Sequence, residues 1–176
     1  MNQIAAAAGT CHRRHIHRHR IAFSECDPAQ IVFFANYFTW FDTASREFFM
    51  ACGIPSWHVT EAERGIIGTP VLDAQATFRA PATYGDDIEI ETTVEQWNTR
   101  SFVMRHVARR GETVLAEGRE VRVFAVRDGD GNDKLKIKSI PIPDDIRAAC
   151  VNCRQAACGI CRTEGAVTEL PTRQTA

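Results

Sequence analysis

The segment from residue 34 to residue 52 constrains the fold more than any other part of the chain. Apolar side chains recur in it at helical spacing, namely Phe34, Tyr37, Phe38, Phe41, Ala44, Phe48 and Cys52, with Trp40, Phe49 and Ala51 on the same face. This face covers about half of the circumference, which is wider than a coiled-coil seam. The segment therefore predicts a long amphipathic helix against a sheet that curves around it, with Asn36 as the N-cap and Gly53 as the stop.

Strand patterns dominate the rest of the sequence. The expected strands are residues 15–23, 72–80, 88–95, 101–109, 113–126 and 134–140, and the expected turns are 84–86, 98–100 and 128–132. Residues 55–70 are rich in Pro and Gly and predict a loop, and Asp144 is a suitable cap for a short last helix. One long helix followed by strands that tight turns connect indicates an α+β architecture.

Composition narrows the class of protein. A chain of 176 residues with 44% hydrophobic and 24% charged residues is typical of a single globular domain. The formal net charge of −1 offers no field for nucleic acid or a membrane surface, so an anionic ligand needs local basic residues. No apolar run is long enough to cross a bilayer. We expect a leader at residues 1–14, a folded domain at 15–150 and a cysteine-containing tail at 151–176.

Cysteine and histidine clusters raise the question of metal. The seven cysteines are an odd number and gather near the C-terminus, which favours a reducing cytoplasm. The pairs Cys150/Cys153 and Cys158/Cys161 resemble metal-binding spacings, but the four-residue spacer between them is shorter than in common zinc ribbons. The tail therefore reads as thiol-rich without metal. A second set of candidate metal ligands lies near the N-terminus and consists of Cys11, His12, His15, His17 and His19. We favour the interpretation that these residues belong to a disordered basic leader.

A carboxylate lies just before the long helix. Pro28 biases Asp27 away from helical backbone, so a turn is expected there. An aspartate before proline is in most proteins only a turn residue. Its position a few residues before a helix N-terminus also suits catalysis, because the first N–H groups of a helix stabilise developing negative charge. No Ser-His-Asp arrangement is recognisable, and His106 falls within a strand pattern.

The residues around Asp27 resemble a known signature. Residues 23–37 read FSECDPAQIVFFANY, which is similar to the 4-hydroxybenzoyl-CoA thioesterase family. The likeness continues through short matching segments, among them 63–66, 68–70, 101–106 and 121–125, and spans residues 17–150. The resemblance implies a hotdog fold, in which an antiparallel sheet wraps one long helix. It also implies active sites shared between the two chains of a dimer, and usually a homotetramer.

The resemblance implies a role for particular residues in hydrolysing an acyl-CoA thioester. Asp27 corresponds to the nucleophile or general base, the Phe34 backbone to the oxyanion site, and Thr69 to the acyl site. The residues implied to bind CoA are Trp57 at the thiol arm and Arg100, Ser101 and Lys138 at the nucleotide phosphates. No cofactor or metal is implied. Two departures weaken the match: Gln30 stands where relatives have Gly, and residues 98–100 keep one cation of a basic triplet, for which Lys134 and Lys136 are possible substitutes.

Three functions follow from this sequence. An aromatic acyl-CoA thioesterase, acting on a hydroxybenzoyl-type group, is the first. A short aliphatic acyl-CoA is the first alternative, and a metal-binding sensor on a hotdog scaffold, using the C-terminal cysteines, is the second. Glu25 and Asp42 are rival carboxylates to Asp27. Asp42 is expected to be solvated, with contact to a polar group of the acyl moiety as the alternative.

Overall fold

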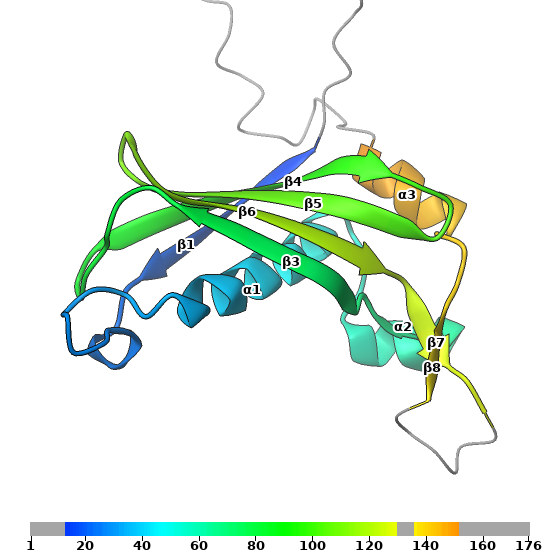
Figure 1. Cartoon of the computed structure of the whole chain (residues 1–176). Helices are drawn as coiled ribbons and strands as arrows, with labels where there is room; N and C mark the ends of the chain where they lie inside the picture. The colour runs from blue at the N-terminus through cyan, green and yellow to red at the C-terminus, as the bar shows by residue number, and fades with distance from the viewer. Residues whose placement is uncertain (1–12, 130–135, 152–176) are drawn as a thin grey trace, which may run out of the picture.

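The computed structural model describes residues 13–129 and 136–151. Its main sheet has five antiparallel strands in the order β1-β4-β5-β6-β3, and the sheet curves around the long helix α1, Ala35–Ala51 (Figure 1). The strands are β1 Arg14–Arg20, β3 Val71–Phe78, β4 Asp87–Trp97, β5 Ser101–Arg110 and β6 Thr113–Val123. This arrangement confirms the predicted helix wrapped by an antiparallel sheet.

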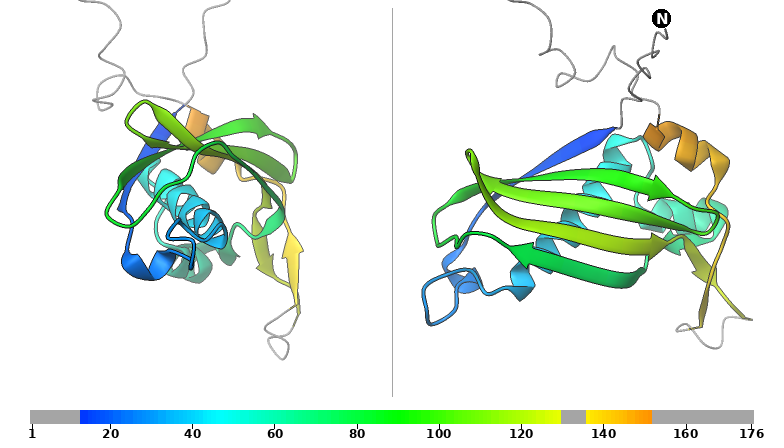
Figure 2. Two further views of the ribbon diagram at one scale, coloured as in Figure 1. Left: turned by 60° about the vertical axis from the view of Figure 1, so that its left-hand side comes forward. Right: turned by 45° about the horizontal axis from the view of Figure 1, so that its top comes forward.

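Shorter elements gather at one end of the sheet. A second sheet has the order β2-β7-β8, formed by Ile66–Gly68, Ala125–Arg127 and Ile137–Ser139. Helix α2, Trp57–Arg64, and helix α3, Asp144–Val151, lie at the same end (Figure 2). The opposite end carries the short 3-10 helix Phe23–Glu25 and the loop that leads into α1.

The helix α1 buries the face that the sequence predicts. Its buried residues are Tyr37, Trp40, Phe41, Ala44, Ser45, Phe48 and Phe49. Gly53 adopts a left-handed backbone with φ of 86°, as a helix stop requires. The N-cap prediction was wrong: Phe34 is the N-cap, and Asn36 lies inside the first turn. Asn36 instead donates from Nδ2 to the Glu25 carbonyl at 2.8 Å, which ties the preceding loop to the helix.

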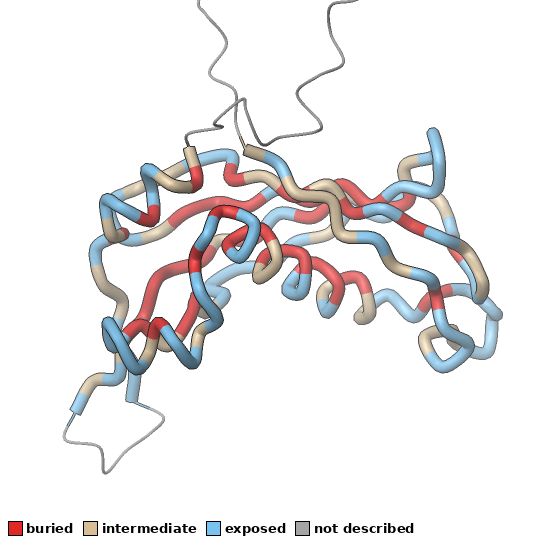
Figure 3. The backbone as a smooth tube through the Cα atoms, turned by 180° about the vertical axis from the view of Figure 1, so that it is seen from behind, coloured by how far each residue is buried: buried red, intermediate tan, exposed pale blue. Residues whose placement is uncertain are grey.

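The core consists of two apolar clusters along α1. Figure 3 marks the buried positions of the chain in red. Phe41 belongs to the first cluster and Phe49 to the second. Ser45 lies between them on the helix and is fully buried, so a polar layer separates the two clusters. Gly118 of β6 makes room for Phe41, because an added Cβ there would lie 2.6 Å from the Phe41 ring atom Cδ2.

Three predictions about secondary structure were wrong. The loop expected at residues 55–70 contains α2 and β2, because the Pro and Gly residues fall at the ends of these elements and not within them. The strand expected at 113–126 is interrupted at Phe124, where the chain leaves the main sheet and enters the second one. The last strand is shorter than 134–140, and residues 134–135 lie outside the described residues.

Strand β3 is the exposed edge of the main sheet. It pairs with β6, and no other described strand pairs with it. Seven of its eight residues are exposed, including Leu72 at 65% and Phe78 at 46%. A long edge strand with exposed apolar side chains is a template for pairing with another chain.

Candidate active site

The loop that carries Asp27 is closed by its own hydrogen bonds. The Asp27 N–H donates to the Ile31 carbonyl at 2.9 Å, and the Phe33 N–H donates to the Glu25 carbonyl at 2.9 Å. The carboxylate oxygen Oδ1 of Asp27 accepts from the Ala29 N–H at 2.8 Å. One carboxylate oxygen is thus engaged, and the second has no partner among the described residues. The predicted turn at Asp27 is confirmed.

Gln30 stands where related sequences have glycine, and its backbone conformation is one that glycine favours. Its φ of 64° makes it the one non-glycine residue with positive φ in the described ranges 13–129 and 136–151. Glycine adopts this backbone without steric cost, whereas an L side chain is disfavoured there. Here the loop keeps its shape with glutamine, held by the bond from Thr83 Oγ1 to the Gln30 carbonyl at 2.7 Å.

The start of α1 offers free backbone donors. Among the described residues, the N–H groups of Phe34 and Ala35 have no protein acceptor. The first N–H groups of a helix point along its axis and favour negative charge. Because the backbone makes this donation, phenylalanine is as suitable here as any other residue, and Phe34 as a whole is 56% exposed. A carbonyl oxygen that becomes negative during a reaction is stabilised at such a position.

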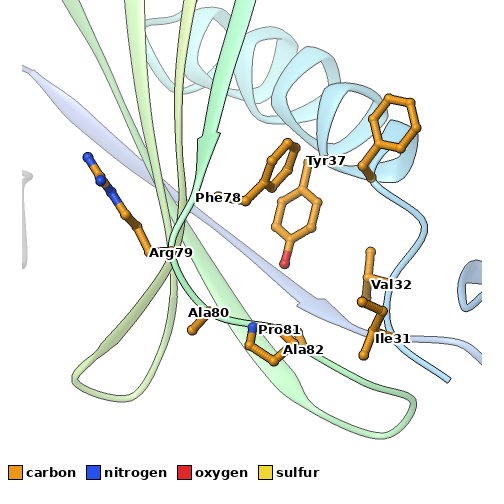
Figure 4. Close-up of a pocket in the computed structure, with 9 residues that line it drawn as sticks. Ile31, Val32, Tyr37, Phe78, Arg79, Ala80, Pro81 and Ala82 are labelled. Atoms are coloured by element: carbon orange, nitrogen blue, oxygen red, sulfur yellow. The ribbon is translucent and has the colours of Figure 1, made fainter. Parts of the chain in front are cut away.

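A mostly apolar pocket of about 340 Å³ lies beside the start of α1 (Figure 4). It is lined by Ile31, Val32, Phe34, Tyr37, Phe78, Arg79, Ala80, Pro81 and Ala82. The rings of Tyr37 and Phe78 meet edge to face, with centroids 5.3 Å apart. The guanidinium of Arg79 points away from the rings. The pocket therefore suits an apolar or aromatic group placed next to the free helix donors.

The rival carboxylate Glu25 is fully occupied. Its side chain accepts from the Ala22 N–H at 2.7 Å, from Trp40 Nε1 at 2.9 Å and from His19 Nε2 at 2.9 Å. Burial by itself raises the pKa of Glu25, but these hydrogen bonds outweigh it and the net shift is downward. Glu25 therefore ties β1, the 3-10 helix and α1 together, and it has little capacity left for a substrate.

The expected phosphate-binding residues meet at the opposite end of the molecule. Arg100 donates from Nη1 to the Ser139 carbonyl at 2.7 Å, next to Lys138. Ser101 Oγ accepts from Asn98 Nδ2 at 3.0 Å. Lys138 Nζ lies 3.0 Å from Asp128 Oδ1, and Lys136 is 3.9 Å from the same carboxylate. Arg100, Lys136 and Lys138 therefore lie at one corner of the molecule, where Asp128 partly neutralises the lysines, and their binding of phosphate stays a prediction.

Trp57 lies near the end of α1 and is covered by an arginine. The Arg46 guanidinium carbon is 4.5 Å from the centre of the Trp57 ring. Arg46 donates from Nη2 to the Pro55 carbonyl at 3.0 Å, while its Nη1 is buried without a partner among the described residues. Thr69 follows Gly68. The backbone of Gly68 packs against Trp57, because a Cβ added at Gly68 would lie 3.5 Å from Trp57 Cδ1. Trp57 therefore lies close to the segment that carries Thr69, and the roles of both residues in the site stay predictions.

Asp42 is not simply solvated. Its carboxylate is 67% exposed, yet Oδ1 accepts from Arg122 Nη2 at 2.8 Å. The expected solvated side chain is confirmed, and the sequence did not show its ion-pair partner because Arg122, on β6, lies 80 positions away. The contact with an acyl group stays a prediction.

The buried residues Ser45, His106 and Glu120 do not form a catalytic relay. Ser45 Oγ donates to Glu120 Oε2 at 3.1 Å, and His106 Nε2 also meets Glu120 Oε2 at 3.1 Å. In a relay the serine and the acid bind opposite nitrogens of the histidine. Here both lie at Nε2, and Nδ1 is bonded to Thr92 Oγ1 at 2.9 Å. All are buried away from solvent.

The histidines of β1 are structural in this fold. His15 Nε2 and His17 Nδ1 both contact Glu47 Oε2, at 3.0 and 2.9 Å, and His19 contacts Glu25. The interpretation of these positions as a disordered leader was wrong, because they form a strand that Glu47 fastens to α1. Within residues 13–129 and 136–151, no group of side chains is arranged to hold a metal ion. Cys11, His12, Cys153, Cys158 and Cys161 lie outside the described residues.

Comparison with known proteins gives the family. The model of the thioesterase-like superfamily matches residues 21–150. The chain belongs to this superfamily. It is 43% identical to a 4-hydroxybenzoyl-CoA thioesterase of Pseudomonas sp. (strain CBS-3), over 74% of this chain and 93% of that protein. The resemblance found in the sequence is confirmed.

Solved structures of the superfamily confirm the hotdog fold. A 4-hydroxybenzoyl-CoA thioesterase variant in complex with 4-hydroxybenzoyl-CoA superposes with a TM-score of 0.73 at 38% identity, covering 78% of this chain and 99% of that one. A gentisyl-coenzyme A thioesterase superposes with a TM-score of 0.65 at 30% identity, over 77% and 98% of the two chains. The predicted thioesterase class is confirmed at the level of family and fold, and no described helix is long and apolar enough to span a membrane.

The two halves of the expected thioesterase site lie far apart within one chain. Asp27 and Phe34 are at the start of α1, whereas Trp57 and the cationic corner are near its end. The 17 residues of α1 separate them by about 25 Å. Sequence reasoning also missed Arg147, which donates from Nη2 to the Trp97 carbonyl at 3.2 Å beside the same corner. It lies in α3, which the sequence placed near the tail.

Proposed function

We propose that this chain hydrolyses aromatic acyl-CoA thioesters, in sites that two chains share. The observation that carries the proposal is the apolar pocket beside the free N–H groups of Phe34 and Ala35. An aromatic acyl group fits the pocket, and its thioester oxygen then lies near positive helix dipoles. The similar thioesterases act on 4-hydroxybenzoyl-CoA and gentisyl-coenzyme A, according to their names.

Asp27 supplies the carboxylate for the reaction. In one route its free oxygen attacks the thioester carbonyl, the C–S bond breaks, CoA leaves as thiolate, and water hydrolyses the resulting mixed anhydride. In the other route Asp27 removes a proton from water, which attacks the carbonyl directly. Single turnover in ¹⁸O water distinguishes the routes. Only direct attack carries an Asp27 oxygen into the product, and it does so in those turnovers in which water attacks the Asp27 carbonyl of the anhydride.

Two chains complete the site. The reacting end and the cationic corner are about 25 Å apart in one chain, so a partner subunit is the natural source of Trp57, Arg100, Ser101 and Lys138. The exposed β3 edge provides a surface for the dimer. A homotetramer is the larger assembly that we propose. The unpaired thiols of Cys26, Cys52 and Cys150 fit a cytoplasmic location, where the surroundings are reducing.

Release of free thiol from a panel of acyl-CoA substrates tests the function. We expect 4-hydroxybenzoyl-CoA and related aromatic thioesters to be cleaved with higher kcat/KM than acetyl-CoA or hexanoyl-CoA. Preference for the aliphatic thioesters establishes the aliphatic alternative. No thiol release from any substrate, with stoichiometric metal in the purified protein, establishes the sensor alternative.

A further inference from the structure

The loop of residues 25–33 carries Asp27 on its first arm and leads directly into α1. Hydrogen bonds between its two arms close the loop, so that it forms one unit. At its base, the Glu25 carbonyl accepts from the Phe33 N–H at 2.9 Å and from Asn36 Nδ2 at 2.8 Å. The backbone of Glu25 is therefore attached to the first turn of the helix, two positions before Asp27.

The side chain of Glu25 attaches the same point to further elements. Its Oε1 accepts from Trp40 Nε1 of α1 at 2.9 Å, and its Oε2 accepts from His19 Nε2 of β1 at 2.9 Å and from the Ala22 N–H at 2.7 Å. Since a carboxylate only accepts, His19 carries a proton on Nε2. Burial by itself raises the pKa of Glu25, but these bonds produce a net downward shift, so the carboxylate is ionised and the bonds are charge-assisted.

The donors to Glu25 are themselves held in place. Trp40 is 4% exposed, and the side chains of His19 and Glu25 are 24% and 19% exposed. The His19 ring lies against the Trp40 ring, with centroids 4.8 Å apart. His19 is also fixed by its strand, because it pairs with Ile88 of β4. Glu25, His19 and Trp40 therefore form a packed group, which we call the Glu25 clamp.

The place of this clamp matters for a reaction at the start of α1. In the proposed hydrolysis Asp27 acts on a carbonyl whose oxygen lies near the N–H groups of Phe34 and Ala35. A misplacement of about 1 Å between reacting groups costs up to about a hundredfold in rate. The second arm of the loop is tied to residues 82–83, whereas the Glu25 clamp ties the arm with Asp27 to β1 and α1.

We propose that Glu25 is a positioning residue for the carboxylate of Asp27. Through His19 and Trp40 it holds the arm with Asp27 at a fixed distance from the first N–H groups of α1, so that both act on one thioester carbonyl. Glu25 touches no reacting atom, because donors of this chain occupy its two oxygens. The inference rests on the proposed thioesterase function and on Asp27 as its carboxylate.

The first test is the variant Glu25→Gln. It keeps the shape of the side chain but removes the charge and one acceptor oxygen. We expect kcat on the acyl-CoA that the wild type cleaves best to fall about tenfold or more, because Asp27 is displaced from the carbonyl. KM should stay nearly unchanged, since the proposed CoA contacts lie at the other end of the molecule.

Glu47→Gln is the matched control. Glu47 also joins α1 to histidines of β1, because its Oε2 lies 3.0 Å from His15 Nε2 and 2.9 Å from His17 Nδ1. It lies three turns further along the helix and has no contact with the loop that carries Asp27. Glu47→Gln should lower the melting temperature but leave kcat unchanged, which separates positioning from general stability.

Rescue at position 19 provides a second test. His19→Leu removes the donor to Glu25 and should lower kcat with KM retained. His19→Gln should recover most of this loss, because the amide nitrogen of glutamine reaches about as far as Nε2 and donates to the same carboxylate. If Glu25→Gln does not fold, Trp40→Phe replaces it, since phenylalanine keeps a ring and removes the donor on α1.

A double-mutant cycle shows whether Glu25 acts through Asp27. In Asp27→Asn, the added change Glu25→Gln should lower the remaining kcat no further. The positioning role is overturned by an unchanged kcat in Glu25→Gln, by equal losses of kcat in Glu25→Gln and Glu47→Gln, or by equal relative losses in both backgrounds of the cycle. A wild-type protein that cleaves no acyl-CoA thioester instead contradicts the proposed function, and the inference with it.

Discussion

The loop before α1 contains the carboxylate that we propose as catalytic, Asp27, and a residue with an unfavourable backbone conformation, Gln30. Asp27 has one engaged and one open carboxylate oxygen, and Gln30, three positions later, holds a backbone that glycine prefers. The hydrogen bonds from Gln30 N–H to the Asp27 carbonyl at 2.8 Å and from Thr83 to the Gln30 carbonyl keep this shape. The loop geometry around Asp27 therefore depends on a residue that is not itself reactive.

The first prediction concerns this backbone. Gln30→Gly removes the steric cost of φ at 64°, which is about 1 kcal/mol for an L residue. Glycine also raises the conformational entropy of the unfolded chain, which offsets part of this gain in stability. We expect the variant to be as stable as the wild type or more stable, by up to about 1 kcal/mol, in urea unfolding. Ala29→Gly, in the same loop but without positive φ, should be less stable than the wild type. Destabilisation of equal size in both variants contradicts this account.

The second prediction concerns Asp27 itself. Asp27→Asn preserves the shape of the side chain and its bond from the Ala29 N–H but removes the nucleophilic charge. We expect kcat on the preferred acyl-CoA to fall by about two orders of magnitude or more, with KM largely retained. Asp87→Asn, at an exposed carboxylate that pairs with Arg20, is the control and should stay active. Wild-type turnover by Asp27→Asn on every substrate would refute the mechanism.

Among the elements, β6 carries the most unusual side chains. Its inward positions are Ala116, Gly118, Glu120 and Arg122, so apolar and small residues give way to a charged pair inside the sheet. Gly118 admits the Phe41 ring, and that ring stacks on His106 of β5. The packing of α1 on the sheet and the buried pair Glu120 and Arg122 thus depend on the same strand.

The third prediction tests the contact between β6 and α1. In Gly118→Ala the new methyl group would lie 2.6 Å from Phe41 Cδ2 and 2.9 Å from Cζ, so the ring must move. Overpacking of this kind costs about 1–3 kcal/mol, which thermal or urea unfolding should detect. The double variant Gly118→Ala with Phe41→Leu should recover part of the loss, since leucine is smaller than phenylalanine. An unchanged melting temperature in Gly118→Ala would show that the ring is not confined.

The fourth prediction concerns pH. Burial raises the pKa of Glu120, but hydrogen bonds from His106 and Arg122 and the charge of Arg122 lower it from the ordinary 4.5 to about 2. Above pH 4.5 the resulting stabilisation is fully present. As the pH falls from 4.5 towards 2, the unfolded chain binds the proton first, so the stabilisation is lost.

Urea unfolding of the wild type and Glu120→Gln at several pH values measures this effect. The stability advantage of the wild type over the variant should be constant above about pH 5 and should shrink below pH 4.5. Glu112→Gln, in the exposed turn between β5 and β6, serves as the control. A difference between wild type and Glu120→Gln that stays constant down to pH 3 contradicts a buried ionised Glu120.

The same elements show what the sequence could and could not predict. The helix and strands were predictable because residues such as Phe41 and Ile90 repeat with the period of their element. Asp27 was predictable only through resemblance, since a turn aspartate has no periodic signal. The link from Asp42 to Arg122 joins residues 80 positions apart, so only the folded structure reveals it. The charged residues Glu120 and Arg122, which share a face of the strand with Ala116 and Gly118, were the available signal.

At the scale of the whole molecule, the two proposed parts of the site lie at opposite ends of one chain, and the β3 edge of the sheet is unpaired among the described residues. The loop with Asp27 lies at one end of α1, and the corner with Arg100 lies at the other. A substrate that touches both within one chain would have to extend along the helix, about 25 Å. Pairing of two chains in opposite directions instead brings the Asp27 end of each chain near the Arg100 end of the other. A dimer is therefore expected in light scattering.

The fifth prediction tests this sharing of sites by mixing two defective variants. Asp27→Asn is expected to abolish turnover, and Arg100→Ala is expected to raise KM, because a phosphate contact far from the carbonyl gives mainly uniform binding. If each site takes Asp27 from one chain and Arg100 from the other, a mixed dimer has one site with both defects and one intact site. If each site belongs to one chain, every site in the mixed dimer keeps one defect.

Equal amounts of the two variants, unfolded together and refolded, form mixed dimers in about half of the cases, so about one quarter of all dimer sites should be intact. A component with the wild-type KM should then appear, although neither variant alone shows it. Mixing without unfolding is the control, since chains that do not exchange cannot form the intact site. Refolded mixtures that contain mixed dimers but show only the raised KM of Arg100→Ala would place the whole site within one chain.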